Sequence, residues 1–159
     1  MKRYCVIISM FFTGVIIGQK NGTMDNVATY KKEVKQTIVE FFEGFHKGDT
    51  SIIRKTIDQD ITLKTVIKTK EGSYSTRSTN VSDFMRVIHE MAQKSRWNER
   101  LLLFKIEADK QLATAWTPYE FYLNDTFSHC GINTFQLYHD GTRWKILSVV
   151  DTRKKEDCQ

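Results

Sequence analysis

Apolar residues recur at intervals of three and four along residues 27–45, the spacing that puts side chains on one face of a helix. The members of this stripe are Val27, Tyr30, Val34, Ile38, Phe41 and Phe45. We therefore predict a helix of about twenty residues. Asp25 or Asn26 can cap its start, and Gly48 can end it.

Two more helices and a hairpin are predicted before residue 99. A short helix spans Thr50–Ile57, and a third begins near Ser82, whose side chain can cap it. Between them, apolar and polar residues alternate from Ile61 to Ile67, which is the period of a half-buried strand. The Glu71-Gly72 pair then favours a turn before a second strand at Tyr74–Thr79.

From Glu99 the alternating pattern continues almost to the end of the chain. It predicts strands at roughly Glu99–Glu107, Leu112–Leu123, Phe127–Tyr138 and Arg143–Asp151. Three helices, a hairpin and then a long antiparallel meander exclude a parallel α/β sheet. The sequence therefore predicts an α+β fold in which the helices cover one face of a curved antiparallel sheet.

Residues 1–18 have the pattern of a secretory signal peptide. Lys2 and Arg3 precede an apolar run, Tyr4–Ile17, that is shorter than the length needed to cross a bilayer. Cleavage after Gly18 would leave residues 19–159 as a single, soluble domain that is secreted or periplasmic. The alternatives are an uncleaved membrane anchor or a buried helix.

Charge and motif content exclude several classes of partner and cofactor. The formal net charge of +5 falls to +3 without Lys2 and Arg3, and the remaining cations are interleaved with acids. We therefore expect no nucleic-acid surface, and no membrane association after cleavage. The four histidines lie on different elements without zinc-ligand spacing, and there is no glycine-rich phosphate loop, so we expect no metal and no cofactor.

The predicted export bears on the state of the cysteines. Only Cys130 and Cys158 would remain after cleavage, an even number for an oxidising compartment. A disulfide between them is predicted if the C-terminal tail folds back over the strand ends, and the alternative is two free thiols.

The order of elements over about residues 27–153 resembles that of the nuclear transport factor 2-like, or SnoaL-like, superfamily. The C-terminal third is more specifically similar to the bacterial group of lumazine-binding proteins. The matching segments are Leu112–Tyr122, Ser128-His129-Cys130-Gly131, Phe135-Gln136-Leu137, Trp144-Lys145-Ile146 and Asp151-Thr152-Arg153. The resemblance implies a cone-shaped, cystatin-like fold.

Members of the superfamily include isomerases, dehydratases, cyclases and proteins that only bind ligands or partners, so the resemblance implies little about function. The catalytic set of the ketosteroid isomerases has no residue-by-residue match here, and none of its roles is carried over.

Strand pairing suggests which side chains face the interior of the cone. A two-residue turn at Asp140-Gly141 would pair Phe135 with Ile146 and Leu137 with Trp144. Alternation then places a polar group further along the same inner face, made up of His129, Gly131, Asn133, Ser148, Val150 and Thr152.

The preceding hairpin adds candidates from residues 112–123. A turn at Asn124-Asp125 would place Glu120 beside His129, a general-base arrangement, and Trp116 beside Asn133. A bulge at Pro118 would instead bring Tyr119 or Phe121 to the inner face. The choice between Glu120 and Tyr119 stays open.

Three functional hypotheses follow from these candidates. The first is an exported protein that binds an unknown small molecule in a conical pocket lined by Trp116, Tyr119 or Glu120, His129 and Asn133. The second is a cofactor-free enzyme of the isomerase or dehydratase kind, with His129 as general base and Glu120 as its partner. The third is a structural or interaction module.

The same pairing predicts an apolar outer face on the last two strands. This face would hold Cys130, Ile132, Thr134, Leu147, Val149, Asp151 and Arg153. Three aliphatic residues on a solvent-facing surface favour a homodimer through the sheet. Asp151 and Arg153 would then pair across the interface, or within one chain.

Overall fold

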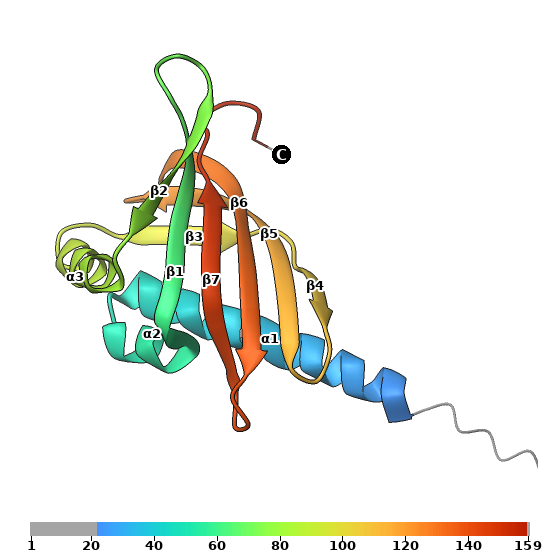
Figure 1. Ribbon diagram of the computed structural model, residues 1–159. Helices are drawn as coiled ribbons and strands as arrows, with labels where there is room; N and C mark the ends of the chain where they lie inside the picture. The colour runs from blue at the N-terminus through green and yellow to red at the C-terminus, as the bar shows by residue number, and fades with distance from the viewer. Residues whose placement is uncertain (1–21, 159) are drawn as a thin grey trace, which may run out of the picture.

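Helices lie against one face of a curved, seven-stranded sheet in the computed structural model, which describes residues 22–158 (Figure 1). The elements are α1 (Gly22–Lys47), α2 (Thr50–Thr56), β1 (Ile57–Lys68), β2 (Tyr74–Thr79), α3 (Val81–Ala92), β3 (Trp97–Leu101), β4 (Lys105–Ala108), β5 (Leu112–Leu123), β6 (Thr126–His139) and β7 (Trp144–Thr152). The predicted α+β fold is confirmed. The predicted signal peptide, residues 1–18, lies outside the described residues.

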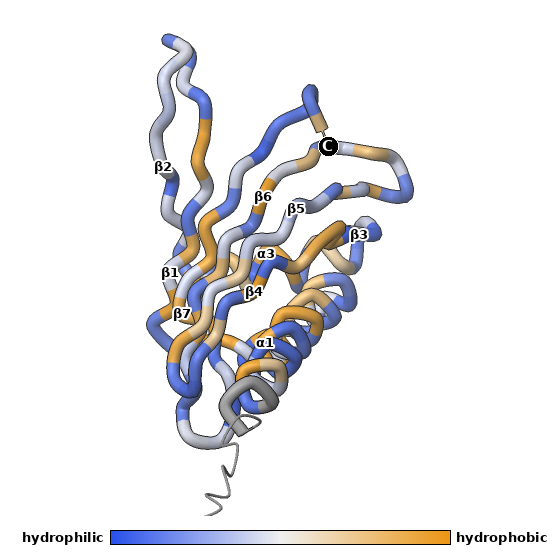
Figure 2. Tube along the Cα trace, turned by 90° about the vertical axis from the view of Figure 1, so that its right-hand side faces the viewer, coloured by the Kyte–Doolittle hydropathy of each residue, from blue (hydrophilic) through white to orange (hydrophobic). Residues whose placement is uncertain are grey.

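Helix α1 runs along the covered face of the sheet, on the same side as α3 (Figure 2). The predicted apolar stripe is its buried face, with Val34, Ile38 and Phe41 almost inaccessible to solvent. The predicted N-cap residues Asp25 and Asn26 lie within the helix, so neither caps it, and the helix ends before Gly48, whose φ of 67° breaks the helical path. Helix α3 is capped by Asn80, which accepts a hydrogen bond from the backbone N–H of Ser82.

The sheet is mixed, in contrast to the predicted antiparallel sheet. Its strand order is β2-β1-β7-β6-β5-β3, and β4 pairs with β5 beside β3. The β1–β7 pair is parallel, and the other pairs are antiparallel. Strand β1 of the first hairpin lies beside β7, the last strand of the meander. No turn joins these two strands, so they are free to run in the same direction.

The turn between β6 and β7 is longer than predicted. The backbone N–H of Asp140 donates to the carbonyl of Arg143 at 3.0 Å, and the Asp140 carboxylate accepts from the backbone N–H groups of Thr142 and Arg143. A hydrogen bond of 2.7 Å from the Thr142 hydroxyl, together with these backbone bonds, lowers the pKa of the Asp140 carboxyl. The turn therefore contains four residues, and the predicted pairing of Leu137 with Trp144 is wrong, because Leu137 pairs with Ile146.

A bulge in β7 then exchanges the two faces of that strand. Leu147 is the extra residue, and beyond it Phe135 pairs with Val149 and Asn133 pairs with Asp151. Period-two alternation therefore turns Val149, Asp151 and Arg153 inward and Ser148, Val150 and Thr152 outward. The predicted sidedness of these six residues is wrong, since one inserted residue reverses every side chain after it.

A second bulge determines whether Tyr119 or Glu120 lies on the inner face of the sheet. Asn124 and Asp125 form the predicted turn, both with positive φ, but the register shifts by one residue between Phe121 and Tyr122. The inserted residue is Ser128 on β6, not a residue at Pro118. Phe121 therefore pairs with His129, which places Tyr119 on the inner face.

The same shift moves two predicted site residues to the outer face. Glu120 pairs with Cys130 and Trp116 pairs with Thr134. The predictions that Glu120 lies beside His129 and that Trp116 lies beside Asn133 are both wrong.

Pro118 lies where one predicted strand breaks into two. The expected strand Glu99–Glu107 is divided into β3 and β4, and the backbone N–H of Leu102 between them donates to the Pro118 carbonyl at 2.9 Å. In a strand, the N–H and C=O of one residue point to the same side, so the missing N–H of Pro118 faces this break. A continuous partner strand would have required that donor.

Candidate functional site

A cavity of about 340 Å³ lies between the inner face of the sheet and helices α1 and α3. Its apolar wall is mostly aromatic, and the aromatic residues are Phe41, Phe42, Phe45, Phe84, Trp97 and Phe121. Three of these rings form a cluster at one end, in which Trp97 lies 5.5 Å from Phe45 and 5.7 Å from Phe121 between ring centroids. The cavity therefore offers ring faces and edges to an apolar ligand.

Glu99 is the central polar group of the cavity. It points inward between the alternating apolar residues Trp97 and Leu101, and its Oε1 atom accepts a hydrogen bond of 2.6 Å from Nδ2 of Asn133. Its backbone N–H donates to Nε2 of His46 at 2.9 Å. Burial raises the pKa of the Glu99 carboxyl to about 7.

Asp151 and Arg153 lie beside Glu99 as a paired acid and base. One carboxylate oxygen of Asp151 accepts from the Thr65 hydroxyl at 2.6 Å, and the other accepts from Nε of Arg153 at 2.9 Å. Asp151 therefore has a cation and a neutral donor, whereas Glu99 has a neutral donor alone.

His129 closes the same polar end from β6. Its ring stacks on Phe121 with 4.8 Å between centroids and meets the edge of Tyr119 at 5.9 Å. Its Nδ1 atom lies 3.1 Å from the Ser128 hydroxyl. Burial, followed by the positive charge of Arg153, lowers the pKa of His129, so the imidazole is neutral at pH 7.

The residues that carry the family resemblance meet at this end of the sheet. Cys130 exchanges two backbone hydrogen bonds of 2.9 Å with Lys154, and its side chain forms a disulfide with Cys158, as predicted. Next to it, Gly131 approaches the Thr152 carbonyl so closely that an added Cβ would lie 1.9 Å from that oxygen. The same carbonyl accepts from the Tyr119 hydroxyl at 2.9 Å. The His-Cys-Gly and Asp-Thr-Arg segments thus fix the end of β7 against β6.

The structure brings together three of the predicted site residues. His129 and Asn133 line the cavity, and Tyr119 lies buried behind its polar end. Trp116 and Glu120 are on the opposite face, where Glu120 accepts from the Tyr122 hydroxyl at 2.9 Å. Neither can act in this cavity.

Sequence reasoning missed Glu99, Asp151 and Arg153. Glu99 has a signal in the sequence, because it alternates with Trp97 and Leu101 and is thus a charged residue at an inward position. Asp151 and Arg153 have none, since their sidedness depends on the bulge at Leu147.

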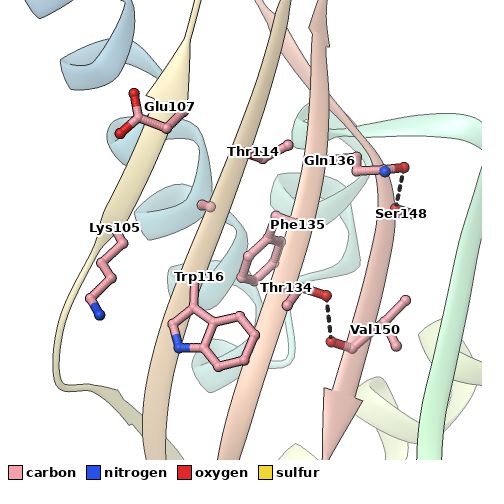
Figure 3. Close-up of a pocket in the computed structure, with 10 residues that line it drawn as sticks. Lys105, Glu107, Thr114, Trp116, Thr134, Phe135, Gln136, Ser148 and Val150 are labelled. Atoms are coloured by element: carbon pink, nitrogen blue, oxygen red, sulfur yellow. Dashed lines mark hydrogen bonds between the residues drawn. The ribbon is translucent and has the colours of Figure 1, made fainter.

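A second, open hollow of about 430 Å³ lies on the outer face of the sheet (Figure 3). Trp116, with 47% of its surface exposed, lies between the polar side chains of the neighbouring strands. Several of these polar groups already have partners within the sheet. The Thr134 hydroxyl donates to the Val150 carbonyl, and the Ser148 hydroxyl donates to Gln136, each at 3.1 Å.

Among residues 22–158, no three His, Cys, Asp or Glu side chains gather where they could hold a metal ion. None of the helices in that range has the length and apolar character of a membrane span.

Comparisons with known proteins identify the fold. No protein-family model matches the chain, and no curated protein does. Among solved structures, an NTF2-like protein with a cystatin-like fold from Novosphingobium aromaticivorans matches with a TM-score of 0.68 at 12% identity, over 88% of this chain and 94% of that chain. A protein of unknown function from Mycobacterium tuberculosis matches with a TM-score of 0.66 at 11% identity, over 86% of this chain and 78% of that one.

A third similar structure is named for an activity. It is a candidate dehydratase of the NTF2-like family from Streptomyces avermitilis, with a TM-score of 0.58 at 11% identity, over 77% of this chain and 94% of that chain. At these identities the likeness concerns the fold alone. The chain has the NTF2-like, cystatin-like fold.

Proposed function

We propose that this protein is exported and binds a small molecule in the cavity between α1, α3 and the inner face of the sheet. The observation that carries the proposal is the cavity itself, which has aromatic walls and a group of polar side chains at one end, Glu99, His129, Asn133, Asp151 and Arg153. A pocket of mostly apolar lining with a few convergent polar groups is typical of small-molecule sites. The disulfide supports export, because such bonds persist in oxidising compartments.

The test is mass spectrometry of small molecules released from protein purified from its native host. Val149 and Val150 offer a matched pair, since Val149 lines the cavity and its neighbour lines the outer hollow. We expect a compound in stoichiometric amount from the wild type and from Val150→Phe, and none from Val149→Phe. If the same compound is released from Val149→Phe in an unchanged amount, it binds outside this cavity.

A second candidate function is proton transfer on the bound molecule, as in a cofactor-free isomerase or dehydratase. The observation that favours it is Glu99, whose raised pKa of about 7 lets one carboxyl both accept and donate a proton near neutral pH. Glu99 takes the place of the predicted His129–Glu120 pair, because Glu120 lies on the outer face.

Hydrogen exchange distinguishes the enzyme from the binding protein. If Glu99 removes a proton from a C–H group of the released compound and returns one from solvent, incubation in D₂O will place deuterium in that compound. Glu99→Gln should abolish the exchange. His129→Ala tests the predicted role of the imidazole in the same assay, with ligand affinity measured in parallel. An absence of exchange with the wild type, together with tight binding, identifies a binding protein.

We also propose a homodimer through the outer face of the sheet. Val149 does not support the dimer, since its side chain faces the cavity. Leu147 is the extra residue of the bulge and has no partner in the regular outer face. The support comes from Trp116, which is exposed on the outer face, because aromatic residues are enriched in protein interfaces.

A further inference from the structure

The cavity contains one carboxylate without a countercharge of its own. Of the two inward carboxylates on the sheet, Asp151 accepts from the Arg153 guanidinium at 2.9 Å, whereas Glu99 accepts a single 2.6 Å bond from the neutral amide of Asn133. No second hydrogen bond to the Glu99 carboxylate is present in the described part of the chain. A carboxylate in an apolar cavity is costly unless it is paired. The second oxygen of Glu99, Oε2, is therefore available to a ligand.

The charged residues around the cavity leave an excess of one negative charge. With Glu99 ionised, the lining contains three carboxylates, Asp83, Glu99 and Asp151, against two cations, Lys64 and Arg153. Lys64 and Asp83 are exposed to solvent, so their charges are screened and contribute little. The uncompensated charge is therefore that of Glu99, the inward member of the group.

The charges of Asp151 and Arg153 act on the Glu99 carboxyl in opposite directions, and its remaining titratable neighbours are neutral. Burial lowers the pKa values of His46 on α1 and His129 on β6, and it raises that of the Tyr119 hydroxyl on β5. None of them supplies a positive charge at pH 7. The protein itself thus provides no cation for Glu99 from these elements.

The surroundings of Glu99 suit a positive ligand. Trp97 precedes it by two residues on the same face, Phe121 is its cross-strand partner, and Phe45 packs on both rings. All three line the cavity. Ring faces attract cations, most strongly where water is excluded, so an ammonium group beside Glu99 would meet a carboxylate and aromatic rings together.

We propose that the ligand of this cavity is a small monocation, an apolar or aromatic compound carrying one protonated amine that binds the Glu99 carboxylate. This inference rests on the proposed binding function and names the class of its ligand. The amine supplies the missing countercharge, and the apolar part of the compound packs against the rings of α1 and α3.

The experiment compares three probes of similar size that differ in charge: 4-phenylbutylamine, 4-phenyl-1-butanol and 4-phenylbutyrate. Binding to the full mature chain is measured by titration calorimetry at pH 8.5 and pH 5.5. We expect the amine to bind at least about tenfold more tightly than the alcohol at pH 8.5. The preference should diminish at pH 5.5, where the Glu99 carboxyl is protonated.

Proton release gives a second, independent readout. Near pH 7 the Glu99 carboxyl is about half protonated, so binding of the amine should release roughly half a proton per site, seen as a dependence of the heat on the buffer. The alcohol should release none. Glu99→Gln should remove both the preference and the proton release while alcohol binding persists, and Glu120→Gln on the outer face, the matched control, should change neither.

The outcomes separate this inference from the function on which it rests. Equal binding of amine and alcohol, or a preference for the butyrate, overturns the amine proposal but leaves a small-molecule pocket. Amine binding that Val149→Phe does not reduce overturns it as well, because the probe is then outside the cavity. If none of the three probes binds, both the ligand class and the proposed small-molecule binding in this cavity are wrong.

Discussion

The two faces of the sheet each carry a hollow of similar size, and they differ in what surrounds the polar groups. On the outer face, the hydroxyls of Thr134 and Ser148 have partners within the sheet, and Trp116 is open to solvent. On the inner face, helices cover the cavity, and Glu99 is held in an apolar environment by one amide. Burial of a carboxyl group, not volume, gives the inner face its chemistry, because desolvation raises the pKa of Glu99 to the neutral range.

The C-terminal tail connects these two faces, and removal of its disulfide should have the largest effect. Cys130 is on the outer side of β6, and the tail that it anchors carries Arg153 into the inner site. Cys158→Ser should reduce the free energy of unfolding by about 3.5 kcal/mol, because it opens a closed loop of about 29 residues. Urea denaturation with and without a reductant measures this.

The reductant provides the control for the disulfide. It should destabilise the wild type to the level of Cys158→Ser and should leave the variant unchanged. Titration of the denatured, unreduced protein should find no free thiol at Cys130 or Cys158. Two reactive thiols per mature chain would contradict the bond.

The comparison of the two faces is tested next by Glu99→Gln. The Glu99 carboxyl has a pKa of about 7 in the folded protein against 4.5 in a model peptide, so the folded state favours its protonated form. The associated stability is fully present below pH 4.5 and is lost as the pH rises to about 7. Glu99→Gln should therefore stabilise the protein by about 3 kcal/mol at pH 8 and have little effect at pH 4.

Thermal unfolding across this pH range is the measurement, and Glu120→Gln is the matched control. Glu120 lies one strand away on the outer face, so the same change of a carboxyl to an amide should leave the pH profile unchanged. A profile for Glu99→Gln that runs parallel to that of the wild type from pH 4 to pH 8 would refute the buried carboxyl.

The limit of sequence reasoning lies at the two bulges. The helical stripe of α1 and the turn at Asn124-Asp125 were predictable, because each depends on local spacing or on a local turn signal. Ser128 and Leu147 carry no such signal, yet each inserts one residue into a strand and reverses its faces. His129 and Asn133 were found because they lie between the bulges, in the part of β6 where the predicted inner and outer sides agree with the structure.

Residues beyond the bulges were therefore misplaced, although their chemistry was noticed. Asp151 and Arg153 were expected to pair, and they do, but on the inner face, where the pair helps to form the site. Trp116 was expected in the pocket because the predicted register put it beside Asn133, and the observed register places it outside. The side of the sheet on which such a residue lies depends on the strand register, which the alternating pattern alone does not determine.

Gly131→Ala tests whether the close approach of β6 and β7 holds the inner site in place. A Cβ at this position would lie 1.9 Å from the Thr152 carbonyl and 2.9 Å from the Tyr119 ring, so β6 and β7 would have to move apart. We expect a loss of about 2 kcal/mol in the free energy of unfolding. Because Asp151 and Arg153 lie on either side of Thr152, amine binding should weaken as well. Unchanged stability and affinity would show that the close approach is not needed.

The smallest effect on stability is expected from Trp116→Lys. Its indole is half exposed on the outer face, so its replacement should change the free energy of unfolding by no more than about 0.5 kcal/mol. If two copies pair through this face, however, the added charge would be buried in the interface, and the mass measured by light scattering should fall from that of a dimer to that of a monomer. The cavity faces the other way, so the affinity for 4-phenylbutylamine should be unchanged. A wild type that is monomeric at high concentration, or a variant that remains dimeric, would remove the outer face from consideration as the interface.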